Sequence, residues 1–244
     1  MRVKITLARA SSEQEIKMPL DFRRHFISFI KTMIKGSQAF TRFEEERPGY
    51  SPYVFSINFK QIIDINRTLQ EMTVKPPITM TVSSGLFDPI TAICNGAIVS
   101  KGEKTVLGLT VQDVQLLPLK QIRSNMVEFK IAGHAVLRSA EDYVDGSNIG
   151  ELEEAINTHL VTKAGFLRNG DNSELPENKI TAVRVLPPAE YRKGVCYHYG
   201  GQLTTLQGKI RLAGSPEALQ FLYDFGLGVR TGQGFGLLEV VNEL

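Results

Sequence analysis

The sequence is poor in several residue types, and each shortage argues against a class of protein. It has two cysteines in 244 residues, Cys94 and Cys196, without CxxC spacing, so neither a disulfide framework nor a cysteine zinc site is expected. No apolar run approaches the roughly 20 residues that span a bilayer. The N-terminal MRVKITLARASSEQE alternates apolar and polar residues and lacks a signal-peptide core. A cytoplasmic protein, neither membrane-bound nor secreted, is therefore expected.

Tryptophan is absent, aromatic residues make up 8% of the chain, and no pair among the four histidines has HxxxH spacing. These shortages predict no metal and no cofactor, and they provide no aromatic pair of the kind that RRM sheets present to RNA. A net charge of +2 argues neither for nor against nucleic acid as a partner. With 42% apolar and 22% charged residues, the composition is that of a soluble globular protein.

The basic residues are unevenly distributed. Five of them occur between positions 23 and 42 with no acidic residue among them: Arg23, Arg24, Lys31, Lys35 and Arg42. The run predicts either a basic patch beside a helix or an ordinary solvated helix face.

The first half of the chain predicts a βαββαβ unit. Strands are expected over residues 2–8, 53–59, 78–84 and 105–117, where apolar and β-branched residues dominate or alternate. Helices are expected over 22–34 and 88–102, with Asp21 and Asp88 as N-caps and Gly36 as a stop.

The second half repeats this order. Strands are expected over 126–138 with a bulge at Gly133, over 179–188, over 194–214 as a hairpin turning at Gly200–Gly201, and over 235–241. Helices are expected over 151–167 and, opened by Ser215 and Pro216, over 215–226. The fold class is therefore α+β, with two tandem ferredoxin-like (βαββαβ, RRM-like) domains over residues 1–119 and 120–244.

The segment GLGVRTGQGFG, residues 226–236, places five glycines around Arg230 just before the last strand. Glycine permits positive φ and close backbone approach, and a row of exposed N–H groups would form a concave surface for phosphate. Arg230 adds a planar charged fork. The segment leads into a strand, so it is not a dinucleotide motif, and no GxxxxGK[ST] is present. The alternative is a glycine-rich turn that fixes the last strand.

The spacing G-apolar-G, five residues including a basic one, then G-apolar-G resembles the CRISPR-associated repeat-RNA endoribonucleases, the Cas six family of the RAMP (repeat-associated mysterious protein) superfamily. The segments MPLDFRRHFISFIKTMIK, PYVFSIN and VEFKIAGHAVLR are similar to that family at corresponding places. The resemblance implies a metal-independent endoribonuclease that cleaves CRISPR precursor repeat RNA to give guide RNAs. In that reaction the RNA's own 2′-hydroxyl attacks and leaves a 2′,3′-cyclic phosphate.

The resemblance and the residue chemistry together give the candidate site. The catalytic candidates, chosen for proton transfer and charge stabilisation, are His25, Lys31 and Tyr50. The RNA-binding candidates are Arg24, Lys35, Gly226, Gly228, Arg230, Gly232, Gln233, Gly234, Phe235 and Gly236. No metal ligand is assigned.

Two alternatives remain open. The histidine that the family carries shortly after its first helix is missing here, and Glu44 and Glu45 stand at that place. The protein is then a catalytically weak or inactive RNA-binding RAMP protein that serves as a subunit of a CRISPR interference complex. The other alternative is a protein-binding tandem ferredoxin-like chain, and a homodimer is left open.

The three other histidines have ordinary explanations in the sequence. His134 and His198 are expected to pack in strands. His159 is expected on a solvated helix face with Glu153, Glu154 and Lys163.

Overall fold

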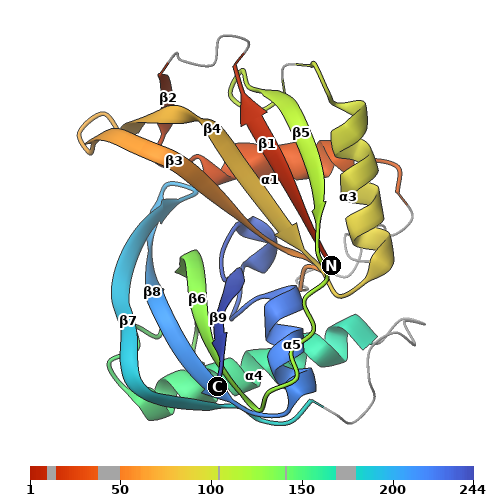
Figure 1. Ribbon diagram of the computed structural model, residues 1–244. Helices are drawn as coiled ribbons and strands as arrows, with labels where there is room; N and C mark the ends of the chain where they lie inside the picture. The colour runs from red at the N-terminus through yellow and green to blue at the C-terminus, as the bar shows by residue number, and fades with distance from the viewer. Residues whose placement is uncertain (10–14, 38–49, 104, 141, 169–179) are drawn as a thin grey trace.

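The computed structural model describes residues 1–9, 15–37, 50–103, 105–140, 142–168 and 180–244. Two antiparallel sheets follow one another along the chain, each with helices packed against it (Figure 1). This confirms the predicted α+β fold class. Within the described ranges, no helix is both long and apolar enough to cross a membrane.

The first sheet is built from the N-terminal half. Its strands are β1 (Arg2–Ala8), β2 (Ile16–Pro19), β3 (Val54–Asn66), β4 (Glu71–Ser83) and β5 (Thr110–Leu117). The four long strands lie in the order β3, β4, β1, β5, and the short β2 pairs with the outer part of β4. Helices α1 (Arg23–Met33) and α3 (Phe87–Val99) bury their apolar stripes in the core beneath this sheet.

Several element ends differ from the sequence prediction. α1 begins after Phe22 without a side-chain cap, and the N-cap of α3 is Leu86, so Asp21 and Asp88 are not N-caps. The last strand of this half begins at Thr110 instead of 105, since Leu107 and Gly108 turn with φ of 54° and 72°.

The β3–β4 hairpin is longer than predicted. Residues 60–71 of the hairpin are exposed, so no buried face imposes a period-two pattern there. The short β2 strand was not predicted either, because its alternation of buried Ile16 and Met18 with exposed Lys17 extends over only four residues.

The second sheet repeats the arrangement. Its strands are β6 (Met126–Ala135), β7 (Arg184–His198), β8 (Gly201–Ala213) and β9 (Leu238–Glu243), in the order β7, β8, β6, β9. Its helices are α4 (Ile149–Arg168), α5 (Pro216–Phe225) and the short 3-10 turn η1 (Thr231–Gln233). The fourth strand of each half thus lies beside the first, and the third between the first and the second, which is the ferredoxin-like order.

Local signals in this half are mostly confirmed. The register of β6 shifts between Ile131 and Ala135, which brackets the predicted bulge at Gly133. The Ser215 side chain accepts a hydrogen bond from the N–H of Ala218 and caps α5. The last strand begins at Leu238 rather than at 235.

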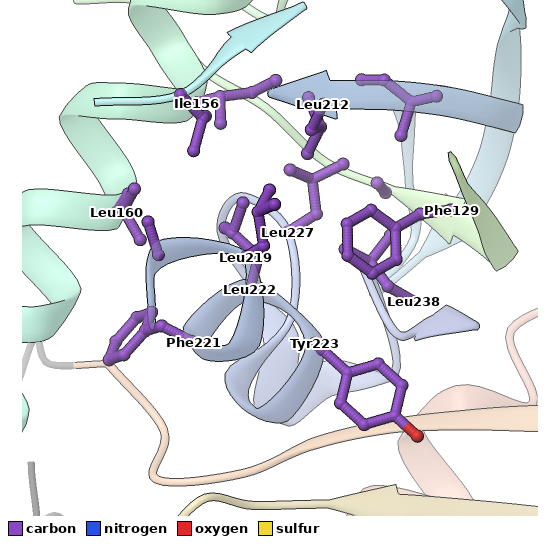
Figure 2. Close-up of a cluster of buried hydrophobic side chains, with 14 of the residues drawn as sticks. Phe129, Ile156, Leu160, Leu212, Leu219, Phe221, Leu222, Tyr223, Leu227 and Leu238 are labelled. Atoms are coloured by element: carbon purple, nitrogen blue, oxygen red, sulfur yellow. The ribbon is translucent and has the colours of Figure 1, made fainter. Parts of the chain in front are cut away.

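The core of this half lies between the sheet and its two long helices. Side chains of α4, of α5 and of the inner sheet face meet there, as Figure 2 shows for Ile156 and Leu160, Leu219 and Leu222, and Phe129 and Leu212. Burial of such side chains contributes roughly 1.5–3 kcal/mol each, so this core holds α5 firmly against the sheet. The rigid end of α5 fixes where the glycine-rich segment starts.

Buried polar contacts join the two halves. The guanidinium of Arg2, on β1, donates to the carbonyl oxygens of Tyr223 and Leu238 at 2.7 and 2.6 Å and lies 3.5 Å from the Tyr223 ring centroid. The first strand is therefore tied both to α5 and to β9. The domain boundary after residue 119, which lies between β5 and β6, stays a prediction.

Candidate functional site

The glycine-rich loop, defined here as residues 226–236, connects α5 to β9. Gly226, Gly228, Gly234 and Gly236 have φ of 86°, 77°, 87° and 79°. These values lie in the left-handed region, where an L side chain is strained. The predicted need for positive φ is confirmed at all four positions of the motif.

The same glycines allow close packing. A Cβ atom at Gly228 would lie 2.2 Å from the carbonyl oxygen of Val136, and one at Gly236 would lie 2.2 Å from that of Leu227. A Cβ atom at Gly226 would meet Val54 of β3 at 2.7 Å. The glycine-rich loop therefore lies between the two halves of the molecule, in contact with β3 on one side and with the end of β6 on the other.

The N–H groups of this loop correct one expectation. Six of them, on Gly226, Leu227, Val229, Gln233, Gly234 and Gly236, donate to carbonyl oxygens of the protein itself. They do not form the open row of donors expected for a phosphate. At these positions the glycines serve close packing of the protein itself, as in the alternative interpretation. Binding of RNA by this loop stays a prediction.

A buried lysine holds the loop from the side of α4. Lys163 is 1% exposed, and its Nζ donates to the carbonyl oxygen of Phe225 and, at 2.8 Å, to Thr231 Oγ1. The expectation that Lys163 lies on a solvated face is therefore wrong. Burial lowers the pKa of Lys163 to about 7, because an ammonium ion loses its hydration there.

This pKa gives a testable pH dependence. Between about pH 7 and pH 10 the unfolded chain keeps the Lys163 proton while the folded chain has lost it, so the contribution of Lys163 to stability rises with pH. We expect the free energy of unfolding of the wild type, relative to Lys163→Met, to increase across this range and to stay level below pH 7. Urea titrations of both proteins at several pH values measure the difference, and a constant difference contradicts it.

One arginine of the basic run turns inward. Arg23 is 7% exposed; its Nε donates to the carbonyl oxygen of Gly234 at 3.2 Å and one terminal nitrogen to Cys196 Sγ at 2.9 Å. Its guanidinium also lies 4.6 Å from the ring centroid of Phe235. Arg23 therefore fixes α1 to the glycine-rich loop and is not part of a basic surface patch.

The other members of the run divide into two groups. Arg24, Lys31 and Lys35 are exposed on or just after α1. Arg42 lies outside the described residues, as do Glu44 and Glu45.

Arg230 lies at one end of a row of polar side chains. It has a left-handed φ of 58°, and one terminal nitrogen donates to Gln233 Oε1 at 3.0 Å. His198 Nε2 lies 2.9 Å from the same oxygen, and His198 Nδ1 lies 3.5 Å from Asp21 Oδ1. This row of side chains thus runs from the glycine-rich loop through β7 to Asp21, two residues before α1. His198 is buried, as expected for a strand, but its polar partners were not foreseen.

His25 lies four residues after Asp21, which ends this row of side chains. It is half-buried on α1, and Arg24 Nε donates to its Nε2 at 3.4 Å. Burial and the charge of Arg24 lower the pKa of His25, while Asp21 opposes them. The ring is therefore mainly neutral at pH 7, which is the form that accepts a proton.

Tyr50 lies with α4 instead. Its hydroxyl is 3.2 Å from His159 Nδ1, and His159 Nε2 is 2.9 Å from the carbonyl oxygen of Arg138. Since the carbonyl can only accept, Nε2 carries the proton and Nδ1 accepts from Tyr50. Burial lowers the pKa of His159 and raises that of Tyr50. His159, expected on a solvated face, is half-buried and is the partner in this contact.

The structure therefore brings together only part of the candidate set. Arg24 and His25 lie on the first turn of α1, just after Asp21 at one end of the row of polar side chains that holds Arg230, whereas Lys31 is six residues after His25, about 9 Å at 1.5 Å per residue. Among the described residues, His25, Lys31 and Tyr50 make no hydrogen bond to one another. No group of three or more His, Cys, Asp or Glu side chains in these ranges is arranged to hold a metal ion.

Known proteins resemble this chain in part of its sequence and in its fold. A protein-family model described as "CRISPR associated protein Cas6, C-terminal" matches residues 117–240, just over half of the chain, from the end of β5 into β9. A search of curated proteins found no match.

Several solved structures share the fold over nearly the full length. One is described as a Cas6-related gene from Pyrococcus furiosus, with 20% identity and a TM-score of 0.76 over 100% of this chain and 99% of that one. A RAMP protein binding different RNA substrates has 18% identity and a TM-score of 0.76 over 99% and 100%. A Cas6 product complex has 14% identity and a TM-score of 0.65 over 98% of each chain. At these identities the likeness shows the fold alone.

The family match includes both the second sheet and the glycine-rich loop that joins it to the first. The element order, the loop glycines and the family match agree. The chain belongs to the Cas6 family of CRISPR-associated RAMP proteins.

Proposed function

We propose that this chain is a metal-independent endoribonuclease that binds CRISPR precursor repeat RNA and cuts it to give guide RNAs. The observation that carries the proposal is the side-chain connection from Arg230 through Gln233 and His198 to Asp21. It connects the guanidinium of the glycine-rich loop to the segment just before α1, the helix that carries Arg24 and His25. Similar folds have been solved as a Cas6 product complex and a Cas6 substrate mimic complex.

The chemistry assigned to these residues needs no metal. Arg24 Nε turns from His25 Nε2 to the phosphate, and the freed Nε2 of the neutral ring takes the proton from the 2′-hydroxyl, whose oxygen then attacks the adjacent phosphorus. The phosphorus–5′-oxygen bond breaks and water supplies a proton to the departing oxygen, so a 2′,3′-cyclic phosphate and a 5′-hydroxyl result. Arg24 and Arg230 offset the negative charge that builds up on the phosphorane.

The binding part of the proposal is tested at Arg230. We expect Arg230→Ala to weaken binding of repeat RNA. The plot of log K against log salt, which has a negative slope, should become less steep by about 1, the loss expected for one phosphate contact. Arg123→Ala, which removes an exposed arginine before β6, is the matched control and should leave the slope unchanged. Fluorescence anisotropy at four or five salt concentrations measures both. Equal slopes for the wild type and Arg230→Ala would remove Arg230 from the RNA site.

One observation favours a second function, RNA binding without cutting. The departing 5′-oxygen needs a proton, but the Tyr50 hydroxyl is bonded to His159 instead of lying next to His25. The histidine that the family places after its first helix is also missing from the sequence. In this second function the chain retains repeat RNA as a subunit of a CRISPR complex.

His25→Ala separates the two functions. If His25 accepts the proton, the single-turnover cleavage rate falls by about 10²–10⁴-fold in the variant. The wild-type rate should rise with pH and level off below the usual histidine pKa of about 6.5, because burial and Arg24 lower the pKa of His25.

Ser28→Ala, an exposed change one turn further along α1, is the control and should cleave at the wild-type rate. Cleavage that persists unchanged in His25→Ala removes the histidine from the mechanism. A wild type that binds repeat RNA without cutting it supports the second function.

A further inference from the structure

Asp21, His198 and Gln233 form a buried row, called here the Asp21–His198–Gln233 unit, between α1, β7 and the glycine-rich loop. The His198 side chain is 1% exposed and its ring stacks edge-on against Phe235, with centroids 5.2 Å apart. So enclosed a ring does not contact RNA itself. Its two nitrogens instead face the side chains on either side.

The contact with Arg230 determines which atoms of this unit donate hydrogen bonds and which accept them. A guanidinium only donates, so the Gln233 atom 3.0 Å from it is the amide oxygen. The same oxygen lies 2.9 Å from His198 Nε2, and an oxygen that already accepts can only accept again. His198 therefore carries a proton on Nε2, and its second nitrogen, Nδ1, is left to face Asp21.

His198 and Asp21 need one more proton between them to form a hydrogen bond. His198 Nδ1 and Asp21 Oδ1 lie 3.5 Å apart, and both are buried without a hydrogen-bond partner among the described residues. With a neutral ring, a lone pair of Nδ1 faces a carboxylate, which is unfavourable. With a proton on Nδ1, the pair becomes a charge-assisted hydrogen bond.

The second oxygen of Asp21 fixes another residue. Asp21 Oδ2 accepts the backbone N–H of Tyr199 at 2.9 Å, and Tyr199 has a left-handed φ of 48°. Its side chain is 61% exposed, and its ring lies against His198 with centroids 4.6 Å apart. The unit thus contacts two non-glycine residues in a strained left-handed backbone region, Tyr199 and Arg230.

We propose that the Asp21–His198–Gln233 unit positions Arg230 and Tyr199 to recognise one nucleotide of bound RNA, the guanidinium on a phosphate and the exposed ring stacked on a base. This rests on the proposed function and names its recognition residues. An arginine fork and an aromatic ring are the groups that single-stranded RNA meets in many proteins. Asp21, His198 and Gln233 act as positioning residues, since none of them has to touch the RNA.

The unit also couples RNA binding to a proton. Burial lowers the pKa of His198, the hydrogen bond with Gln233 and the charge of Asp21 raise it, and the charges of Arg23 and Arg230 lower it further. A phosphate on Arg230 offsets that cation, so protonation of His198 becomes easier in the complex. RNA affinity should therefore rise as pH falls from 8 to 6, with proton uptake on binding.

The test uses two substitutions of the same histidine. We expect His198→Ala to weaken repeat-RNA binding about tenfold, as Arg230→Ala does, with the double variant no weaker than either single one. His198→Gln keeps a donor toward Gln233 but cannot be protonated, so it should restore most of the affinity and abolish the pH dependence. His134→Ala, on strand β6 of the same sheet and also near Arg23, is the matched control, and its effect should add to that of Arg230→Ala.

Each result bears on the proposal. Additive losses for His198→Ala and Arg230→Ala overturn it, as does a His198→Gln protein as weak as His198→Ala. An unchanged affinity in Tyr199→Ala removes the stacking contact. Circular dichroism and urea unfolding of each variant exclude loss of fold as the cause.

Failure of the proposed function gives a different result. If the wild type binds no repeat RNA, that function fails, while the unit is still tested by nitrogen-15 NMR of the His198 ring in the free protein. The unit predicts a proton on Nε2 throughout the titration and a second on Nδ1 as pH falls. A neutral ring protonated on Nδ1 contradicts it.

Discussion

Replacing Gly236 by alanine is expected to lower the free energy of unfolding by at least about 3 kcal/mol. The backbone there has a φ of 79°, and a Cβ atom would lie 2.2 Å from the carbonyl oxygen of Leu227 and 3.1 Å from its carbonyl carbon. Those neighbours are main-chain atoms, so they cannot rotate away. The loop has to shift, and the hydrogen bond from the N–H of Leu227 to the carbonyl oxygen of Gly236 is strained with it.

A second glycine separates the two causes of this loss. Gly200, in the β7–β8 turn, has a φ of 77° but nothing within 4 Å of an added Cβ atom. Gly200→Ala should therefore lower the free energy of unfolding by about 1–2 kcal/mol, the cost of a left-handed backbone conformation alone. Urea unfolding of both variants measures the difference. Equal losses at Gly236 and Gly200 would show that close packing of the loop contributes nothing.

A single 2′-deoxy nucleotide at the cleavage site is expected to abolish cutting of repeat RNA. Without the 2′-oxygen there is no nucleophile, so the single-turnover rate should fall by more than about 10⁴-fold, beyond the roughly 10²–10⁴-fold contribution of a single proton-transfer residue. Binding should change by less than about twofold, because phosphate contacts dominate affinity.

The control is an RNA with the deoxy nucleotide several positions away, which should be cut normally. Cutting of the deoxy cleavage site would remove the 2′-hydroxyl mechanism. If the protein binds both the all-RNA repeat and the control but cuts neither, RNA binding without cleavage replaces the endoribonuclease function.

Much of the fold was predictable because its signals are local. The apolar stripe of α1, the Ser215 cap of α5 and the Gly200–Gly201 turn each depend on neighbouring residues, and each was confirmed. The glycines of the loop were recognisable too, because positive φ leaves a mark in the sequence. The N-caps at Asp21 and Asp88 were wrong, and for Asp21 the reason is a distant partner: its carboxylate bonds to the N–H of Tyr199, 178 residues away.

The polar partners of the site could not be predicted. Lys163 looks like a surface lysine beside two glutamates, yet it lies buried under Phe225 and Thr231, far along the chain. The Tyr50–His159 contact joins residues 109 positions apart. Such pairs are created by tertiary packing, within the second half for Lys163 and between the two halves for Tyr50 and His159, and leave no periodic pattern in the sequence.

The burial of Arg23 changes how the basic run is interpreted. Charge counting treated Arg23 and Arg24 alike, but successive helix residues point about 100° apart, so one is buried against the glycine-rich loop and the other is exposed. Only the exposed members, Arg24, Lys31 and Lys35, remain available to RNA on this helix.

The most direct test of the account is a structure of the protein bound to repeat RNA carrying the 2′-deoxy cleavage site. We expect a phosphate oxygen within hydrogen-bond distance of the Arg230 guanidinium, with the RNA crossing the surface that carries Arg24 and His25. RNA bound elsewhere on the protein, with the guanidinium in contact only with Gln233, would contradict it.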